Sequence, residues 1–326
     1  MSDLIKLIVQ IPAYNEKASI AETISCIPRS VPGVDQVEVL VIDDGSSDNT
    51  SEIARQAGAD HVVRHTSNRG LARAFQTGIE TCLFLGADII VNTDADNQYD
   101  AADIQKLVEP ILQGRADIVI GDRQIDQVPH FSPMKKRLQR LGSAVVRLLS
   151  STDIPDAVSG FRAISRHAAL RLNISSDFSY TIEMLIQAGH DRLAVTSVPI
   201  RTNPTERKSR LFKSTPQFMF RSALTLLRIY VTYKPFRAFV TMGLILGVIG
   251  LIPMIRFLYY YFVDGGAGHI QSLVIGSSFL VMGGLFFMFG LLAELIAFNR
   301  KTLGLALTKI RCLEDLIRSL DSRHDN

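Results

Sequence analysis

Hydrophobic positions in the first half of the chain form short runs rich in β-branched residues, each about the length of a strand. The runs are "LIKLIVQIP", "VEVLVIDD", "HVVRH", "ADIIVNTD", "ADIVIGD" and "VTSVPI". Amphipathic stretches of helical length lie between them, at residues 18–26, 50–57, 71–84 and 101–114. Nearly continuous apolar strands separated by helices indicate a parallel sheet with helices on both faces. The pattern therefore predicts an α/β domain over residues 1–212.

The second half of the chain contains two much longer apolar segments, at about 237–262 and 272–298, joined by "DGGAGHIQ". Each exceeds the roughly 20 residues that cross a bilayer, so residues 236–298 read as a transmembrane hairpin. The connector has no Lys or Arg, whereas both outer flanks do: Arg228, Lys234, Arg237, Arg300, Lys301 and Lys309. The positive-inside rule then predicts an integral membrane protein whose catalytic domain and termini are cytoplasmic. The alternative is a pair of very apolar core helices in a soluble protein.

Amphipathic segments flank this hairpin on both sides. Residues 213–235 suit a juxtamembrane helix lying in the membrane interface, with a core helix of the α/β domain as the alternative. Residues 299–326 form a predicted cytoplasmic C-terminal helix with a face that could join a neighbouring chain. Glycines inside the apolar segments, such as Gly243 and Gly283, would allow close helix packing, so a homo-oligomer is possible.

Composition adds mainly exclusions. The formal net charge of +3 is too small to indicate a nucleic acid partner. The three cysteines lie far apart without a CxxC spacing, which is typical of reduced, incidental thiols. The first residues, "MSDLIKLIVQIPAYNE", lack the features of a signal peptide, so we expect the N-terminal domain to stay in the cytoplasm.

Acidic and amide residues follow three of the predicted strands, in "IPAYNE", "VIDDGSSDNT" and "VNTDADNQ". The carboxyl ends of parallel strands meet at one edge, where ligands of such sheets bind. Asp94 and Asp96 alternate onto the same side of their strand end, and Gln98 follows. Such hard oxygen groups suit Mg²⁺ or Mn²⁺, with substrate phosphates as further ligands. Asp43 and Asp44 suit the ribose and base of a nucleotide.

These motifs, with "NRGLARAFQTG" and "IGDRQ" in the same order, resemble family 2 glycosyltransferases of GT-A fold, which have a Rossmann-like nucleotide-binding sheet. The later "DAVSGFRAISR" and "RKSRL", followed by a membrane hairpin, narrow the resemblance to the polyprenyl-phosphate glycosyltransferases, the group of the dolichol-phosphate mannosyltransferases and bactoprenol glucosyltransferases. Most relatives have leucine where this chain has Asn97, and the commoner "DP" stands where this chain has "YD".

The resemblance implies a set of site residues. Those that would bind the nucleotide-sugar are Pro12, Tyr14, Asn15, Glu16, Asp43 and Asp44, with Arg207, Ser209 and Arg210 in a loop that closes over the pyrophosphate. Asp96 and Gln98 would bind the divalent ion, and Asp94, Asp96 and Asp156 are the candidate catalytic residues. The "RKSRLFKS" run also reads as a solvated, membrane-facing charge cluster.

A lipid phosphate needs cationic partners, preferably forked ones. By position in the family pattern these would be Arg123, Lys136 and Arg137; the alternative for the "KKRLQR" cluster is a patch that binds anionic membrane lipid. Asp156 would orient the acceptor or assist proton movement, or else serve in buried hydrogen bonding, and Glu183 leaves the same choice.

The predicted activity is metal-dependent, inverting transfer of a hexose from a GDP-mannose or UDP-glucose type donor to undecaprenyl or dolichyl phosphate. A phosphate monoester is already anionic at neutral pH, so placement and charge neutralisation suffice without a dedicated base. A processive polysaccharide synthase would carry a QxxRW motif, and this chain has no tryptophan. The alternatives are an enzyme that uses a glycolipid or another acceptor, and a catalytically silent membrane scaffold that binds nucleotide.

Overall fold

A computed structural model of the chain describes residues 4–124, 154–174, 180–203, 227–228, 230–232, 234–264 and 269–324. The chain divides into two compact units, one of Met1–Gln217 with Arg311–Asn326 and the other of Phe218–Ile310. Each unit is described by itself. Most of the predicted juxtamembrane segment, 213–235, lies outside the described residues.

The first unit is built on a seven-stranded sheet in the order β3-β2-β1-β4-β6-β5-β7. Its strands are β1 (Lys6–Ala13), β2 (Gln36–Asp43), β3 (His61–Arg64), β4 (Ile89–Asn92), β5 (Ile118–Asp122), β6 (Arg162–Ser165) and β7 (Val195–Pro199). The first four strands are mutually parallel, whereas β6 runs antiparallel between β4 and β5. The predicted parallel sheet is confirmed for the six strands named from the sequence, whereas β6, which was not predicted, is antiparallel; there Arg162 interrupts the apolar pattern that marks the other strands.

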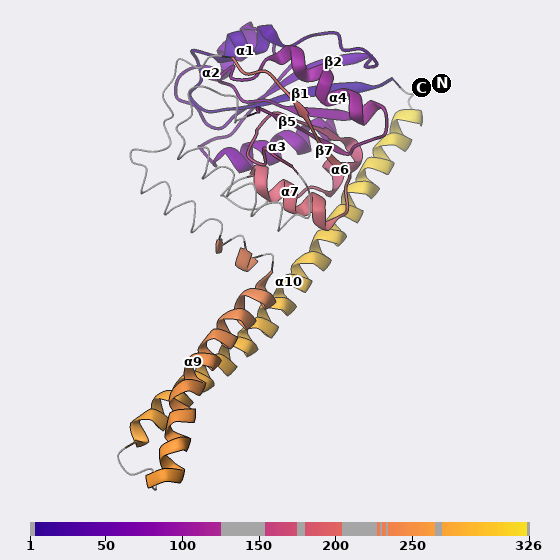
Figure 1. Cartoon of the computed structure of the whole chain (residues 1–326). Helices are drawn as coiled ribbons and strands as arrows, with labels where there is room; N and C mark the ends of the chain where they lie inside the picture. The colour runs from indigo at the N-terminus through magenta and orange to yellow at the C-terminus, as the bar shows by residue number, and fades with distance from the viewer. Residues whose placement is uncertain are drawn as a thin grey trace. The chain divides into compact units, whose positions relative to one another are not determined.

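Helices cover both faces of this sheet (Figure 1). They are α1 (Ile20–Cys26), α2 (Thr50–Gln56), α3 (Leu71–Phe84), α4 (Ile104–Leu112), α6 (Arg166–Arg171) and α7 (Tyr180–His190), with a short 3₁₀ turn, η1 (Ala101–Asp103), before α4. Alternate residues of β1, such as Val9 and Ile11, pack with Ile24 of α1 and Leu107 of α4 in one core cluster. The opposite face is covered by α3. Near-continuous burial explains why the strands lack a polar face.

The strand register brings the polar segments to one edge of the sheet. Ala13 of β1 pairs with Asp43 of β2, and Gln10 pairs with Asn92 of β4. On the other side, Arg162 pairs with both Asn92 and Ile120. The carboxyl ends of β1, β2, β4 and β5 therefore lie level with the amino end of β6.

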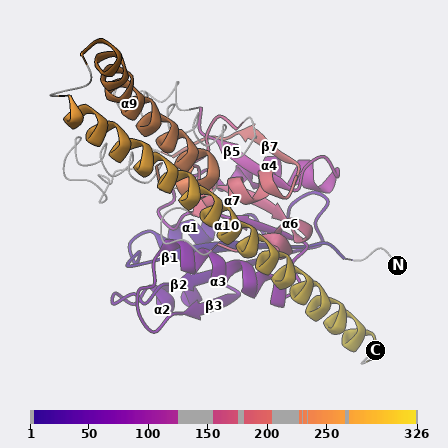
Figure 2. The same ribbon diagram turned by 90° about the horizontal axis from the view of Figure 1, so that it is seen from below.

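The second unit holds a hairpin of α9 (Pro235–Asp264) and the part of α10 (Ile270–His324) that precedes Arg311. The two helices run side by side in both views (Figures 1 and 2). Pro235–Val263 and Ile270–Gly304 are long and apolar enough to cross a membrane, by length and composition. Glycines let the two backbones touch: a methyl group on Gly243 would lie 2.8 Å from the Gly283 carbonyl oxygen. α10 continues without a break beyond the apolar segment to His324.

Candidate active site

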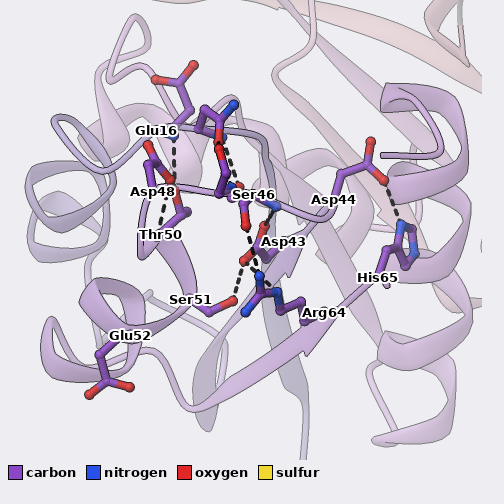
Figure 3. A network of polar contacts seen from close by, with 12 residues as sticks. Glu16, Asp43, Asp44, Ser46, Asp48, Thr50, Ser51, Glu52, Arg64 and His65 are labelled. Carbon is purple, nitrogen blue, oxygen red and sulfur yellow. Dashed lines mark hydrogen bonds and ion pairs between the residues drawn. The ribbon is translucent and has the colours of Figure 1, made fainter. Parts of the chain in front are cut away.

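The loop after β2 is shaped by the carboxylate of Asp43, whose side chain is buried. Its Oδ1 accepts a hydrogen bond from the Ser46 backbone N–H (2.8 Å), and its Oδ2 accepts one from the Ser51 hydroxyl. Arg64, at the end of β3, lies 3.7 Å from Oδ2 and donates to the Ser46 carbonyl. Figure 3 shows Asp43, Ser51 and Arg64 converging. Arg64 was not predicted from the sequence, since it lies in an ordinary strand-end position.

Asp44 points away from this group, toward His65 (Figure 3). Its Oδ1 lies 2.7 Å from His65 Nδ1 and accepts the Arg69 N–H, while Oδ2 accepts the Gly70 N–H (2.8 Å). His65 in turn contacts the Thr77 hydroxyl of α3 through Nε2. The carboxylate thus ties the loop before α3 to the end of β2, a support that the motif alone does not reveal.

Substituting Asp44 with alanine is expected to lower the free energy of unfolding by about 3 kcal/mol, since two backbone N–H groups and a buried histidine lose their acceptor. Denaturant titration of the purified protein measures this loss. Glu52→Ala serves as the control, because Glu52 is exposed and contacts Arg55 and Gln56, two exposed residues of the same helix. It should change stability by less than about 0.5 kcal/mol. Equal stability of the two variants would contradict the supporting role.

The residues that follow β1 interlock with the same loop. The Asn15 N–H donates to the Ser46 hydroxyl, and Asn15 Oδ1 accepts the Ser47 N–H, both at 2.9 Å. Asn15 adopts a left-handed backbone conformation with φ of 53°, which asparagine tolerates well. Pro12 is buried within β1, whereas the Tyr14 ring is 45% exposed. Tyr14 therefore presents a face that a nucleobase could contact.

Asp94, just beyond β4, is partly buried against the loop before β6. Burial raises its pKa to about 6, and the neighbouring charge of Asp96 acts in the same direction. The Tyr99 hydroxyl hydrogen-bonds to the carboxylate and partly offsets these effects. A methyl group on Gly160 would lie 2.8 Å from Asp94 Oδ1, so the carboxylate packs against bare backbone there. Sequence reasoning missed Gly160 and Tyr99, although both belong to quoted motifs.

Asp96 is exposed, and its Oδ1 accepts the Gln98 N–H at 3.1 Å. Asn97 between them has φ of 54°, and the Asn203 side chain donates to its carbonyl. Among the described residues no group of three His, Cys, Asp or Glu side chains could hold a metal. An accessible carboxylate beside a half-buried amide still fits Mg²⁺ or Mn²⁺, which take most remaining ligands from phosphates and water.

Arg123, directly after β5, forms a bidentate ion pair with Asp156. Arg123 Nε lies 2.6 Å from Oδ2 and Nη2 lies 2.9 Å from Oδ1. The Asp156 side chain is 1% exposed and that of Arg123 is 13% exposed. Burial opposes the arginine charge, but the hydrogen bonds and negative charge of Asp156 raise the pKa of Arg123 well above its usual value. The structure thus joins two residues to which the sequence assigned separate tasks.

Arg162, in β6, is fully buried. Its guanidinium donates to the carbonyls of Ala157, Ser159 and Thr181, all within 2.8 Å. Burial lowers the pKa of this arginine to about 10. These bonds hold the loop that carries Asp156 against the start of α7. The sequence placed Arg162 in a motif but predicted no role for it.

The remaining predicted residues divide by whether the structure describes them. Glu183 is buried in α7, where it lies 3.4 Å from the Gln187 amide nitrogen. Glu16 lies at the end of β1, and its N–H donates to the Thr50 hydroxyl. Five predicted residues lie outside the described part of the chain: Lys136, Arg137, Arg207, Ser209 and Arg210.

Comparison with protein families places this site in context. Residues 8–172 match the model described as Glycosyl transferase family 2. Glycosyltransferase AglJ of Haloferax volcanii is 30% identical over 87% of this chain and 91% of its own length. A UDP-N-acetylglucosamine–dolichyl-phosphate N-acetylglucosaminyltransferase of Methanococcus voltae is 31% identical over 60% of this chain and 85% of its own length.

A similar solved structure is that of glucosyl-3-phosphoglycerate synthase from Mycobacterium tuberculosis, in complex with Mn²⁺, UDP and glucosyl-3-phosphoglycerate. The TM-score is 0.52 at 24% identity, covering 68% of this chain and 78% of that one. The likeness confirms the predicted α/β fold of GT-A type.

Proposed function

Because the chain belongs to glycosyltransferase family 2, we propose that it transfers a hexose from a nucleotide-sugar to a polyprenyl phosphate. The observation that carries the proposal is the common sheet edge. The register places the segments that follow β1, β2, β4 and β5 side by side. The acidic residues that would bind the donor therefore lie at the same edge as the Arg123–Asp156 ion pair, whose arginine suits a phosphate acceptor. The dolichyl-phosphate enzyme of Methanococcus voltae, 31% identical, supports this acceptor class.

The donor would lie over the ends of β1 and β2. Tyr14 offers an exposed ring for the base, and Glu16 and Asp43 flank the loop that would receive the nucleoside. Asn15 holds that loop through Ser46 and Ser47, Pro12 is buried in β1 beneath the site, and Asp44 supports the neighbouring loop before α3. By resemblance, Arg207, Ser209 and Arg210 would close over the diphosphate. GDP-mannose and UDP-glucose type sugars, and the UDP-N-acetylglucosamine of the Methanococcus relative, are the donors to test.

A divalent cation, Mg²⁺ or Mn²⁺, would be held by Asp96 and Gln98, and bound there it would neutralise charge on the departing diphosphate. Asp94 would lie beside the donor sugar. The carboxylate of Asp96 is accessible, and the side-chain oxygen of Gln98 is a hard ligand, so the two groups suit either ion.

The acceptor phosphate would be received by Arg123 together with Lys136 and Arg137. Asp156 accepts hydrogen bonds from Nε and Nη2 of Arg123, and it would orient the guanidinium so that Nη1 faces the phosphate. In this arrangement Asp156 serves as a positioning residue, because its own side chain is buried.

The chemistry needs little more than placement. A phosphate oxygen forms a bond to the anomeric carbon while the bond from that carbon to the diphosphate oxygen breaks, and the electron pair leaves with the nucleoside diphosphate. Direct displacement inverts the anomeric centre. The acceptor is already ionised near neutral pH, so no side chain has to remove a proton.

A lipid acceptor would lie in the membrane, and this explains why the catalytic domain would carry a transmembrane hairpin. We assign residues 1–212 to a cytoplasmic catalytic domain, 213–235 to a juxtamembrane helix, 236–298 to a transmembrane hairpin and 299–326 to a cytoplasmic C-terminal helix. The positive flanks of the hairpin support cytoplasmic termini. The hairpin would then hold the enzyme at the membrane that contains the lipid phosphate.

A donor screen with the full chain in detergent tests the proposal. Each nucleotide-sugar is mixed with undecaprenyl or dolichyl phosphate and Mn²⁺ or Mg²⁺, and release of nucleoside diphosphate is measured with and without the lipid. Release that depends on the lipid phosphate is the expected result. Release that requires a glycolipid instead would replace the acceptor class, and metal-dependent nucleotide binding without any transfer would favour a scaffold.

A further inference from the structure

A chain of hydrogen bonds runs through the core of the first unit and ends at Asp94. Gln10 of β1 and Asn92 of β4 are both fully buried, and Gln10 Nε2 donates to Asn92 Oδ1 at 2.9 Å. Asn92 Nδ2 donates to the Gly160 carbonyl at 2.8 Å. The Gly160 N–H donates to the Tyr99 hydroxyl oxygen at 3.0 Å, and the Tyr99 hydroxyl bonds to Asp94.

The direction of this chain is dictated by the backbone of Gly160. A carbonyl only accepts and an N–H only donates, so Asn92 must present its NH₂ group and the Tyr99 oxygen must accept. Tyr99 then has its single proton left for the Asp94 carboxylate. Asn92, for its part, turns its oxygen toward Gln10. Every bond is donated toward Asp94, and bonds aligned in this way polarise one another.

Packing supports the chain of hydrogen bonds at Tyr99 and at Asn92. The Tyr99 ring stacks on Phe161, with centroids 5.1 Å apart. Asn92 Nδ2 also lies 3.2 Å from the hydroxyl of Tyr180, whose ring stacks on Phe75. The Asp94 carboxylate has no room to rotate toward Gly160, since even a methyl group there would lie under 3 Å from both of its oxygens.

We propose that Tyr99 is a positioning residue for the transfer reaction, which orients Asp94 and locks it to the loop carrying Asp156. The inference rests on the proposed function, because it takes Asp94 as part of the donor site. Through Gly160, the strand end that would face the donor and the loop that would face the acceptor are joined by two hydrogen bonds. The donor sugar and the acceptor phosphate would thereby be held in a fixed relative position, and such positioning accounts for most of the rate enhancement when no acid or base catalysis is needed.

The test compares Tyr99→Phe with the matched control Tyr180→Phe, both in the full chain. Each substitution removes one buried hydroxyl and keeps the stacked ring, but among the described residues only that of Tyr99 is hydrogen-bonded to Asp94. We expect Tyr99→Phe to lower kcat about 30-fold with donor KM nearly unchanged, because misplacement by about an ångström can cost 10²-fold. Tyr180→Phe should keep kcat within about threefold. Thermal unfolding of both variants measures the purely structural cost.

A kcat in Tyr99→Phe that matches that of Tyr180→Phe would overturn the inference, as would a loss that scales only with the unfolding temperature. A crystal structure of Tyr99→Phe gives a readout independent of turnover: a displaced Asp94 carboxylate is expected, and an unmoved one would contradict the positioning role. Failure of the unsubstituted protein to transfer from any donor would instead refute the proposed function, and the two failures remain distinct.

Discussion

Replacing Asp96 by alanine is expected to lower lipid-dependent transfer by at least about 10³-fold, because a bound metal contributes several kcal/mol of charge stabilisation in such reactions. Folding should be almost unaffected, since the side chain is exposed and surface substitutions usually change stability by less than about 0.5 kcal/mol. Initial rates with Mn²⁺ or Mg²⁺, with and without EDTA, measure the effect. The unsubstituted protein should lose activity in EDTA and regain it when the ion is restored.

Asp191→Ala is the matched control for this substitution. Asp191 is also exposed, but it lies just before β7, which runs parallel to β5, so it belongs to the opposite edge of the sheet. Its removal should leave transfer unchanged. An Asp96→Ala protein that keeps both its rate and its metal requirement would place the cation elsewhere.

Asp156→Ala is expected to damage stability as well as activity. The substitution leaves Arg123 charged and mostly buried without its bidentate partner. Breaking a buried ion pair by removing one member costs about 3 to 5 kcal/mol. Denaturant titration measures this loss, and the transfer assay should show a parallel fall because the guanidinium is no longer oriented.

A double-mutant cycle with Arg123→Ala separates the pair from its surroundings. The double variant should be less destabilised than the sum of the single variants, since removing both charges leaves none unpaired. Strict additivity, or an Asp156→Ala protein as stable as the original, would show that the two side chains do not act as a pair.

Prediction from the sequence succeeded where burial is periodic. The helix over residues 71–84 coincides with α3 (Leu71–Phe84), and the apolar runs that end in acidic motifs coincide with β1, β2 and β4. Strand β6 was not predicted because it carries Arg162, a charged residue that lies in the core and donates hydrogen bonds to three carbonyl groups. A charged residue in the core cannot be recognised from the pattern alone, since its acceptors come from an irregular loop and from Thr181, which is 19 residues away in the sequence.

The chemistry of the site shows the same division. Asp94, Asp96 and Gln98 stay predicted site residues, and the structure places them in the loop directly after β4, which ends at Asn92. Asp44 looked like a ligand-binding acid, yet its carboxylate accepts bonds from His65, Arg69 and Gly70. Whether an acid faces a ligand or its own chain depends on where the neighbouring loops fold.

By itself, therefore, the sequence determined the α/β class, the family, the apolar hairpin and the acidic edge, because these depend on local periodicity and short motifs. Only the tertiary structure decided that β6 runs antiparallel, that Asp156 pairs with Arg123, and that Gly160 donates to the Tyr99 hydroxyl, which bonds to Asp94. Those contacts join segments far apart in the sequence, such as Ile89 with Ser165 and Tyr99 with Gly160. Their partners are selected by hydrogen-bond satisfaction in the packed core, which no local pattern records.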